Sequence, residues 1–408
     1  MLIDLADATG HQQLLKRINR MALVRHLCVN PALSRADLAT AVGLTKSTVS
    51  MLVRELIDEG WLQEREVVVT GDRGRRPTPL FIDPTRMLLL GAEVGVGVIR
   101  IVATSLTGDV LATHQIEMDA RPAAPEAIRQ LAQGLSQLHQ QLQGEGRQVI
   151  GIGVGLPGGV DEATGVLRFA PNLGWRDLAI GPLLAAELAS TALNAVPLYL
   201  QNEADVAAVG EMEFNATERG DPLIYVSINE GVGAGVIVDD RLLTGHRGFA
   251  GEVGHIVLQI DGPRCSCGRL GCAEALIGLS AMSPTRAEGS QTRTMTELKQ
   301  RLQVRDTLTI AAVHRAGNYL GVLLHNLCAA YDPACIVLGG TGVTLGDDFT
   351  EPALQTLAGY AEAAKLPPPN VRISRFGADA VAVGAAALAR YRLTRPLIAP
   401  NAVARGQA

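Results

Sequence analysis

The strongest chemical signal in the sequence is a group of one histidine and three cysteines. His255, Cys265, Cys267 and Cys272 lie within eighteen residues, with glycines between them. Three thiolates and one imidazole form a tetrahedral ligand set for Zn²⁺, and glycine allows a short loop to fold back on one ion. Ordinary buried cysteines are the alternative, but closely spaced thiols outside a core would be open to oxidation. The sequence therefore predicts a structural zinc site.

The composition of the 408-residue chain indicates the class of protein. Apolar residues make up 47% and charged residues 19%, which is typical of a compact α/β protein of two or three domains. No apolar run reaches the ~18 residues of a membrane span, and the first residues lack the pattern of a signal peptide. We therefore expect a cytoplasmic protein with no membrane partner, where metal binding is favoured over disulfides. The other cysteines, Cys28, Cys328 and Cys335, lie in apolar surroundings and are predicted to be core residues.

The elements near the N-terminus predict a helix-turn-helix. Apolar residues recur at helical spacing over residues 14–27. Ser34 and Asp37 open a second helix with a pattern similar to a capping box, and Thr45 caps a third helix that runs to Gly60. Two short helices joined by a tight turn are the layout of this DNA-binding motif.

The later of these two helices carries small polar and basic residues, which can reach base edges or phosphates. Two short strands around a glycine- and arginine-rich tip follow it and predict a wing, whose arginines suit a narrow minor groove. A plain helical bundle and a solvated hairpin tip are the alternatives. Residues 1–86 hold 12 Lys/Arg against 10 Asp/Glu, a balance compatible with nucleic-acid binding. The residues predicted to bind DNA are Lys46, Ser47, Thr48, Ser50, Arg54, Arg73, Arg75 and Arg76.

From Met87 onward the chain changes to apolar strands that end in glycine turns. Residues 87–118 predict three strands, residues 125–143 a helix and residues 149–160 a buried strand. Such strands are typical of an α/β body whose loops approach a ligand closely. The segment EGVGAGV at residues 230–236 lacks the lysine of a P-loop and the spacing of a dinucleotide fingerprint, so neither motif is assigned. Nucleotide and sugar therefore both remain open as ligands at this point.

Several segments together resemble the ROK family of repressors and sugar kinases, and the resemblance extends over residues 12–392. It implies a winged helix-turn-helix head followed by a two-lobed, actin-like (ribonuclease-H-like) α/β body with a sugar cleft between the lobes. The head is similar to that of xylose-repressor-like members. The segments are NRMALVRHL at 19–27, GIGVGLPGGVD at 151–161, APNLGW at 170–175, QNEAD at 201–205, GEVGH at 251–255, CSCGRLGCAE at 265–274 and IVLGGTGV at 336–343.

The resemblance also implies domain boundaries. We expect a DNA-binding head at residues 1–85, a ROK body at 86–395 and a tail at 396–408. The two lobes of the body are expected at about residues 86–200, together with the C-terminal helix, and at 201–375.

The residues that contact sugar in the family match five positions of this sequence, and Asn172 is expected to lie near them. Carboxylates accept hydrogen bonds from vicinal hydroxyls, and asparagine both donates and accepts. Helix capping or surface charge is the alternative role for the two glutamates beside the zinc group. One histidine is expected to serve twice, with one ring nitrogen on zinc and the other toward the sugar. The sugar-binding positions are Asn172, Asn202, Glu203, Glu252, His255 and Glu274.

Departures from the kinase pattern favour a repressor. The kinases have a general-base Asp where this chain has Glu203, and a displacement of about 1 Å can lower a rate about a hundredfold. Their first phosphate loop reads Asp-x-Gly-x-Thr, whereas here Glu93 replaces the Asp and Gly97 the Thr. Glu230 replaces a Thr of the second phosphate loop, and a carboxylate repels a triphosphate. We expect no catalytic residue.

The sequence thus predicts a repressor that binds operator DNA as a homodimer or homotetramer. A monosaccharide such as xylose or glucose is expected to bind between the lobes and to shift their closure, with Zn²⁺ as the only cofactor. An ATP-dependent sugar kinase that carries a DNA-binding head is the second hypothesis, because Glu203 is still a carboxylate. Zinc sensing is the third, and four protein ligands with no open position argue against it.

Overall fold

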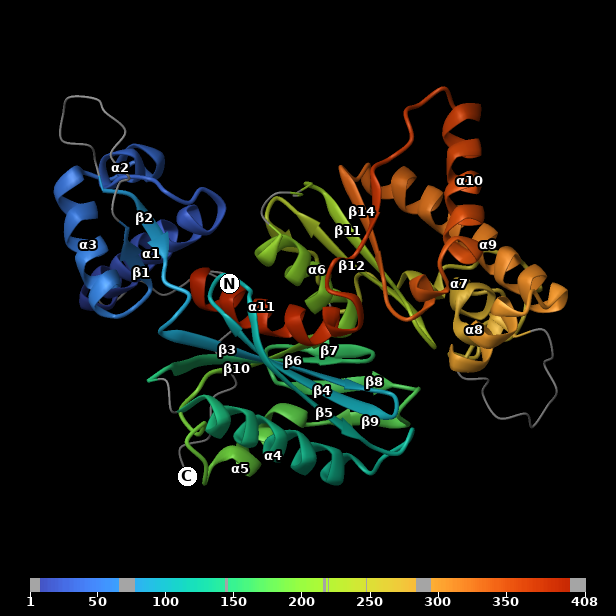
Figure 1. Ribbon diagram of the computed structural model, residues 1–408, viewed down its shortest axis with the longest axis horizontal. Helices are drawn as coiled ribbons and strands as arrows, with labels where there is room; N and C mark the ends of the chain where they lie inside the picture. Colours follow the sequence, from blue (N-terminus) through green and yellow to red (C-terminus); the bar gives the residue numbers. More distant parts are fainter. Residues whose placement is uncertain are drawn as a thin grey trace.

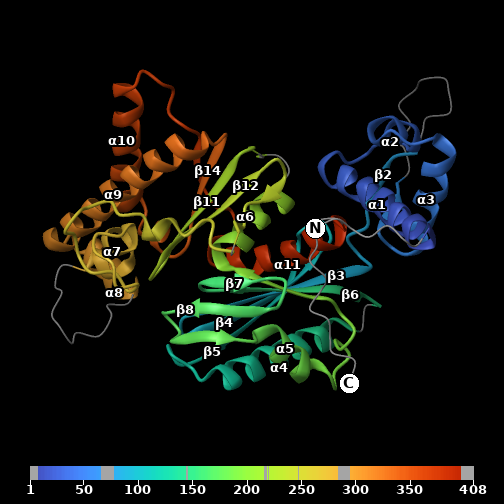
Figure 2. The same cartoon turned by 180° about the vertical axis from the view of Figure 1, so that it is seen from behind.

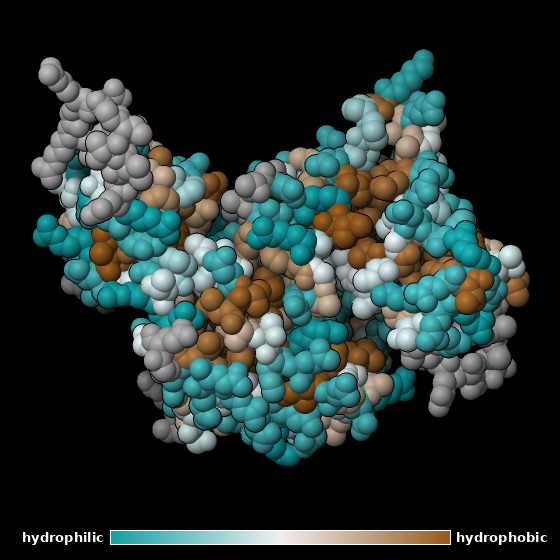
Figure 3. Space-filling model, viewed as in Figure 1, coloured by the Kyte–Doolittle hydropathy of each residue, from teal (hydrophilic) through white to brown (hydrophobic). Residues whose placement is uncertain are grey.

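In the computed structural model, the protein consists of a small helical head and a larger body built on two five-stranded sheets (Figure 1). The structure describes residues 8–65, 78–143, 146–215, 218, 220–246, 248–283 and 295–396, and the statements below concern these residues. The head and the second sheet lie on the same side of the first sheet, and an open notch separates them in the space-filling view (Figure 3). No described helix is both long enough and apolar enough to cross a membrane.

Three helices and a two-stranded antiparallel sheet form the head. They are α1 (Ala8–Val29), α2 (Arg35–Val42), α3 (Lys46–Asp58), β1 (Leu62–Glu64) and β2 (Leu80–Ile82). The capping box predicted at Ser34 and Asp37 is present, and Thr45 caps α3 by accepting from the Thr48 backbone N–H at 3.2 Å. The helix-turn-helix and the strand pair are therefore confirmed. The tip of the hairpin lies outside the described residues, and α1 is longer than the predicted helix because it continues at both ends.

The first sheet of the body has the strand order β10-β6-β3-β4-β5. Helices α4 (Ala124–Leu142) and α5 (Ile180–Leu188) lie on one face, and α11 (Ala380–Thr394) lies on the other (Figures 1 and 2). Because both faces are covered, every residue of β3 is buried. The three strands predicted over residues 87–118 are confirmed. The strands are β3 (Met87–Gly95), β4 (Val98–Ser105), β5 (Val110–Glu117), β6 (Gln148–Leu156) and β10 (Leu198–Asn202).

Helix α11 lies against the first sheet at glycine positions. A Cβ atom on Gly91 would lie 2.0 Å from the Ala382 carbonyl oxygen, and one on Gly153 would lie 1.8 Å from the Ala385 carbonyl oxygen. Both distances are far below van der Waals contact, so only glycine permits this close approach. Helix α11 also packs against α6 (Glu203–Phe214), and these two helices lie between the two sheets.

The second sheet has the strand order β13-β12-β11-β14-β15. Alternate residues of β11 point to opposite faces, so that Leu223 and Tyr225 pack in the cluster that contains α6, while Ile224 and Val226 pack toward α9. The strands are β11 (Leu223–Ile228), β12 (Val232–Val238), β13 (Arg241–Leu242), β14 (Cys335–Gly339) and β15 (Val371–Ile373). The helices of this half are α7 (Ala273–Ile277), α8 (Met295–Gln303), α9 (Thr307–Tyr331) and α10 (Asp347–Ala363).

One sequence expectation needs correction in the segment that follows β6. The predicted single strand over residues 149–160 is interrupted at Pro157 and Gly158, and Gly158 has a positive φ of 100°. The chain there turns out of the first sheet into a small antiparallel sheet of β7 (Gly159–Asp161), β8 (Val166–Ala170) and β9 (Trp175–Leu178). A proline cannot donate a ladder hydrogen bond, which explains the break.

Candidate functional site

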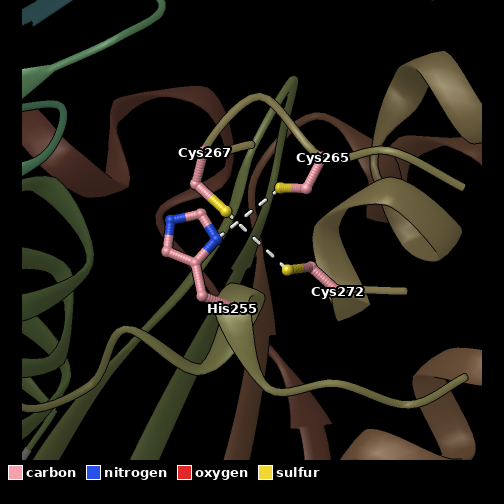
Figure 4. A group of neighbouring side chains, drawn as sticks. All are labelled: His255, Cys265, Cys267 and Cys272. Atoms are coloured by element: carbon pink, nitrogen blue, oxygen red, sulfur yellow. Dashed lines mark hydrogen bonds between the residues drawn. The ribbon is translucent and has the colours of Figure 1, made fainter. Parts of the chain in front are cut away.

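The predicted zinc ligands form one compact cluster in the second-sheet half of the body. His255 ends a 3₁₀ turn (Val253–His255), Cys265 and Cys267 lie in the loop that follows, and Cys272 directly precedes α7. One ligand atom from each residue lies within 4.8 Å of the others, and the four side chains point toward a common centre (Figure 4). The loop closes because Gly271 has a positive φ and approaches Gln259 so closely that a Cβ would lie 1.6 Å from the Gln259 carbonyl oxygen.

The separations within this cluster fit a tetrahedral metal ion rather than a disulfide. The Cys267 and Cys272 sulfurs are 3.8 Å apart, and the Cys265 sulfur is 3.7 Å from His255 Nδ1. Two thiolates at about 2.3 Å from one zinc ion, at a tetrahedral angle, lie about 3.8 Å apart, whereas disulfide sulfurs lie about 2.05 Å apart. Burial raises the pKa of Cys265 to about 12, so its thiol releases a proton when a metal binds.

The six residues matched to sugar contacts all line one small pocket between the two halves of the body, which we call the inner pocket. Asn172 follows β8, Asn202 ends β10, and Glu203 begins α6. The remaining three come from the zinc segment and from α7. Three segments that are far apart in the sequence therefore meet at one place, as the resemblance leads one to expect. The sugar contacts themselves stay a prediction.

Asn202 has a structural task as well as a place in the pocket. Its side-chain oxygen accepts from the backbone N–H groups of Ala204 (2.8 Å) and Asp205 (3.3 Å), which caps α6, and its Nδ2 donates to the Gly158 carbonyl oxygen at 3.0 Å. Both oxygen lone pairs and one N–H are thus engaged within the protein. Only the second N–H of Asn202 remains for a ligand.

The two glutamates beside the zinc group are neither helix caps nor isolated surface charges. Glu274 accepts from the hydroxyl of Ser266 at 2.6 Å and from the backbone N–H of Val232 at 3.4 Å. It therefore joins the loop that holds Cys265 and Cys267, which we call the zinc loop, to the start of β12. Glu252 precedes the 3₁₀ turn without capping it, and its carboxylate lies 3.8 Å from His255 Nε2. The two ring nitrogens of His255 therefore face different partners, the cysteine cluster and the pocket.

The carboxylates around the inner pocket shift one another's proton affinity. Burial, and then the negative charges of Glu93, Glu252 and Glu274, raise the pKa of Glu203 to about 8. Burial also raises the pKa of Glu252. Glu203 is therefore largely protonated near neutral pH and is a hydrogen-bond donor there.

The segments that correspond to phosphate loops place carboxylates in the adjoining part of the cleft. Glu93 is 7% exposed and pairs with Arg100 at 3.1 Å, and Glu230 follows β11. Together with Glu203 they line a pocket next to the inner one, where Arg100 is the one arginine or lysine among the described lining residues. Even with Glu203 protonated, the carboxylates of Glu93 and Glu230 leave this pocket without a net positive charge that would attract a triphosphate.

The residues predicted to bind DNA divide into two groups. Lys46, Ser47, Ser50 and Arg54 are exposed on α3, which lies at the outer edge of the head in both ribbon views (Figures 1 and 2). Thr48 is half-buried, and its hydroxyl lies 2.8 Å from that of the capping residue Thr45. The predicted wing arginines, Arg73, Arg75 and Arg76, lie outside the described residues.

Sequence reasoning missed several side chains of the cleft. Arg100, Phe169 and Phe249 line its pockets but belong to no recognisable motif. The one available signal, which concerns the two phenylalanines, is that aromatic residues are rare and make up 3% of the chain. Of the cysteines predicted to be core residues, Cys335 is buried, and Cys28 and Cys328 are half-buried.

Comparisons with known proteins agree with this architecture. The model of the winged helix-turn-helix DNA-binding family matches residues 16–63, and the model of the ROK family matches residues 89–392. A xylose repressor from Bacillus subtilis strain 168 is 30% identical over 341 residues, which cover 82% of this chain and 84% of that protein.

Two solved structures share the fold. A ROK family transcriptional regulator, described as a homolog of the E. coli MLC protein, aligns with a TM-score of 0.76 at 24% identity, over 94% of this chain and 98% of that chain. A ROK family glucokinase from Streptomyces griseus, in complex with glucose and AMPPNP, aligns with a TM-score of 0.64 at 24% identity, over 74% of this chain and 99% of that chain.

Fold and site together define a class of proteins in which a winged DNA-binding head precedes a two-lobed body of the sugar-kinase type. Within that class, this chain belongs to the ROK family.

Proposed function

We propose that this protein is a sugar-responsive transcriptional repressor, which binds operator DNA through its head and a monosaccharide through the inner pocket. The observation that carries this proposal is the meeting of three separate segments around one small polar pocket, in a chain whose N-terminus folds as a helix-turn-helix. Xylose and glucose are the effectors we propose, because a relative named xylose repressor aligns over most of the chain.

The donors and acceptors of the inner pocket complement a sugar. The free N–H of Asn202 and the protonated carboxyl of Glu203 donate to hydroxyl oxygens. Glu252 and Glu274 accept from hydroxyl hydrogens, and His255 Nε2 faces the same space. A sugar of the wrong stereochemistry would leave some of these groups unpaired, which gives selectivity.

A zinc ion held by His255, Cys265, Cys267 and Cys272 would keep this wall of the pocket in shape. It would supply a rigid cross-link and fix the proton of His255 on Nε2, because Nδ1 would bind the metal. Four protein ligands complete a tetrahedral shell, which is typical of structural rather than catalytic zinc.

The alternative function is that of an ATP-dependent sugar kinase with a DNA-binding head. The observation in its favour is Glu203, a carboxyl group placed in the inner pocket where a general base would act. The carboxylates that replace the phosphate loops argue against it. An assay that couples ADP release to a colour change distinguishes the two functions, because turnover with any hexose or pentose would establish the kinase.

Domain division and assembly are part of the proposal. We assign residues 1–85 to the head, 86–395 to the body and 396–408 to a tail, with the lobes of the body at about 86–200 and 201–375.

The contact between α1 of the head and α11 of the body gives a route from cleft closure to the head. In a homodimer or homotetramer, a change in closure would alter the spacing of two heads, and so the fit to a two-fold operator.

The test is operator binding across a panel of sugars. Fluorescence anisotropy with labelled operator DNA should give a dissociation constant that changes when xylose or glucose is added. A protein that binds the operator with the same affinity in every sugar is not sugar-responsive. A variant with Asn172→Ala should bind the operator normally and lose the response, because that residue is remote from the head.

A further inference from the structure

A second and larger pocket adjoins the inner pocket. Its volume is about 1100 Å³, compared with about 60 Å³ for the inner pocket. Phe169, Glu252 and His255 line both, so the two spaces are continuous at these residues. We call the larger space the outer pocket. It is lined from the first half by β7, β8 and β9 and from the second half by the loop before the 3₁₀ turn and by the zinc loop.

The size of the inner pocket limits it to one sugar ring. A buried water needs roughly 10–15 Å³ of such space, so the inner pocket corresponds to about five waters. A substituent on that ring cannot stay within the inner pocket. It can leave past Glu252 and His255 into the outer pocket, or past Asn172 and Glu203 into the carboxylate-lined pocket of about 220 Å³. The outer pocket is the larger of the two and has space for a whole second ring.

The outer pocket has the surfaces that a second sugar ring requires. Phe169 from β8 and Phe249 from the opposite half offer apolar faces for the C–H side of a pyranose. Phe249 lies against β7, because a Cβ added to Gly159 would lie 2.1 Å from its ring. The Arg176 guanidinium covers one face of the Phe169 ring, with its central carbon 5.4 Å from the ring centroid, and presents N–H donors to the outer pocket.

The charges of the outer pocket fit a neutral polyhydroxyl ligand rather than an anion. Three arginines line it, namely Arg168, Arg176 and Arg269, together with four carboxylates. Arg168 is already bound to Asp161 at 2.9 Å. The balance of three positive against four negative groups gives no net attraction for a phosphate, while it supplies both donors and acceptors for hydroxyls.

From this geometry we propose that a disaccharide binds in the cleft more tightly than the monosaccharides named above, with one ring in the inner pocket and the second ring in the outer pocket beside Phe169 and Phe249. The inference rests on the proposed function, since it takes the inner pocket as the sugar site. The second ring adds contacts to both halves of the body, because the two phenylalanines come from opposite sides of the cleft.

Isothermal titration calorimetry on the zinc-loaded, full-length protein tests this proposal. The ligands are xylose and glucose, their β-1,4-linked disaccharides xylobiose and cellobiose, the α-1,4-linked maltose, and glucose 6-phosphate. At least one disaccharide should bind about tenfold more tightly than its own monosaccharide. Arg176→Ala and Phe249→Ala should each remove this difference and leave the monosaccharide affinity unchanged, because neither residue lines the inner pocket.

The outcomes separate this inference from the proposed function. If a monosaccharide binds and every disaccharide binds equally or more weakly, the outer subsite is overturned and the proposed function stands. Tighter binding of glucose 6-phosphate than of any disaccharide would also overturn it, because the outer pocket would then be an anion site. If no sugar binds, the proposed function itself fails. Should Phe249→Ala unfold the loop, Arg176→Ala still decides, since Arg176 is exposed on β9.

Discussion

Glu203 is a carboxyl group of the inner pocket whose proton affinity differs from that of a free glutamate. Its carboxyl is surrounded by Glu93, Glu252 and Glu274, and its pKa is raised to about 8 by burial and by these charges. A pKa close to the working pH also suits a general base, so this shift by itself does not decide between catalysis and binding. While it is protonated, the carboxyl can donate a hydrogen bond to a ligand oxygen.

The first prediction concerns the pH dependence of stability. Glu203 titrates near pH 8 in the folded protein and near pH 4.3 when unfolded, so the folded state binds more protons between these values. From Glu203 alone, the free energy of unfolding should therefore fall as the pH rises from about 5 to 8, by at most about 1.4 kcal/mol per pH unit. Asp205 and Glu252, whose pKa values are also raised by burial, add to this fall. Urea unfolding at several pH values measures the dependence. Glu203→Gln should make it less steep, and a wild-type profile in that variant would contradict the raised pKa of Glu203.

The second prediction concerns the zinc ligands. Cys267→Ser should lower zinc affinity at least about a hundredfold, since even residues that only support a ligand contribute 10–100-fold. Metal content by mass spectrometry and the melting temperature report the loss, and operator binding without sugar should persist. Cys328→Ser is the matched control, because Cys328 is half-buried in α9, away from the cluster. An unchanged zinc content in Cys267→Ser would show that this residue is not a ligand.

The cluster of His255 and three cysteines could be found from sequence because all four residues lie in one short segment, where spacing limits geometry. The residues of the inner pocket could be found only through the resemblance, since they come from three separate segments. Phe169, Phe249 and Arg100 could not be found at all. No local sequence pattern identifies such a side chain, because its role depends on the residues that lie next to it from the opposite half of the cleft.

At the scale of elements, α11 connects the cleft to the head. Arg392 on α11 is 4% exposed and forms an ion pair with Glu162, which lines the outer pocket, and Gln201 lies 3.5 Å from the same carboxylate. The side of α11 that faces the first sheet packs against Gly91 and Gly153, and α11 also contacts α1. A shift of the cleft can therefore reach the head through one rigid helix.

The third prediction tests the Glu162–Arg392 pair. Arg392→Met should destabilise the body by about 3–5 kcal/mol, because it leaves a buried carboxylate without its partner. The double variant Glu162→Gln, Arg392→Met should recover much of this loss. The exposed pair of Arg129 and Glu126 is the control, where the same type of change should alter stability by about 0.5 kcal/mol. Denaturant unfolding measures the free energy of unfolding of each variant. A decrease below about 1 kcal/mol in Arg392→Met would show that the pair with Glu162 does not stabilise the body.

The fourth prediction concerns helix α3. Lys46→Ala should weaken operator binding and reduce the slope of log K against log salt by about one, because one phosphate contact is lost. Sugar binding should stay at the wild-type value. Lys365→Ala, beyond the end of α10, is the control that changes the same charge far from the head. Arg75→Ala should behave like Lys46→Ala if the wing reaches DNA. Equal salt slopes for Lys46→Ala and wild type would exclude this contact.

At the scale of the whole molecule, the cleft and the head should be coupled reciprocally. If a sugar changes operator affinity by some factor, the operator must change sugar affinity by the same factor. The fifth prediction is that calorimetric titrations of sugar, with and without saturating operator DNA, give a ratio equal to that obtained from anisotropy. For a coupling of about 1–3 kcal/mol the ratio is about 5–150-fold. A ratio of one in both titrations would mean that sugar binding and operator binding are not coupled.

The sequence by itself determined the features that depend on residues close together in the chain. These features are the caps of α2 and α3, the three strands after Met87, and the loop that brings the four predicted zinc ligands together. Only the tertiary structure decided which remote residues meet. It used the oxygen of Asn202 as a helix cap, placed Glu203 among carboxylates that raise its pKa, and opened a second pocket beside the first. The physical reason is that proton affinity, hydrogen-bond capacity and cavity shape depend on neighbours in space, and in this cleft those neighbours come from two different sheets.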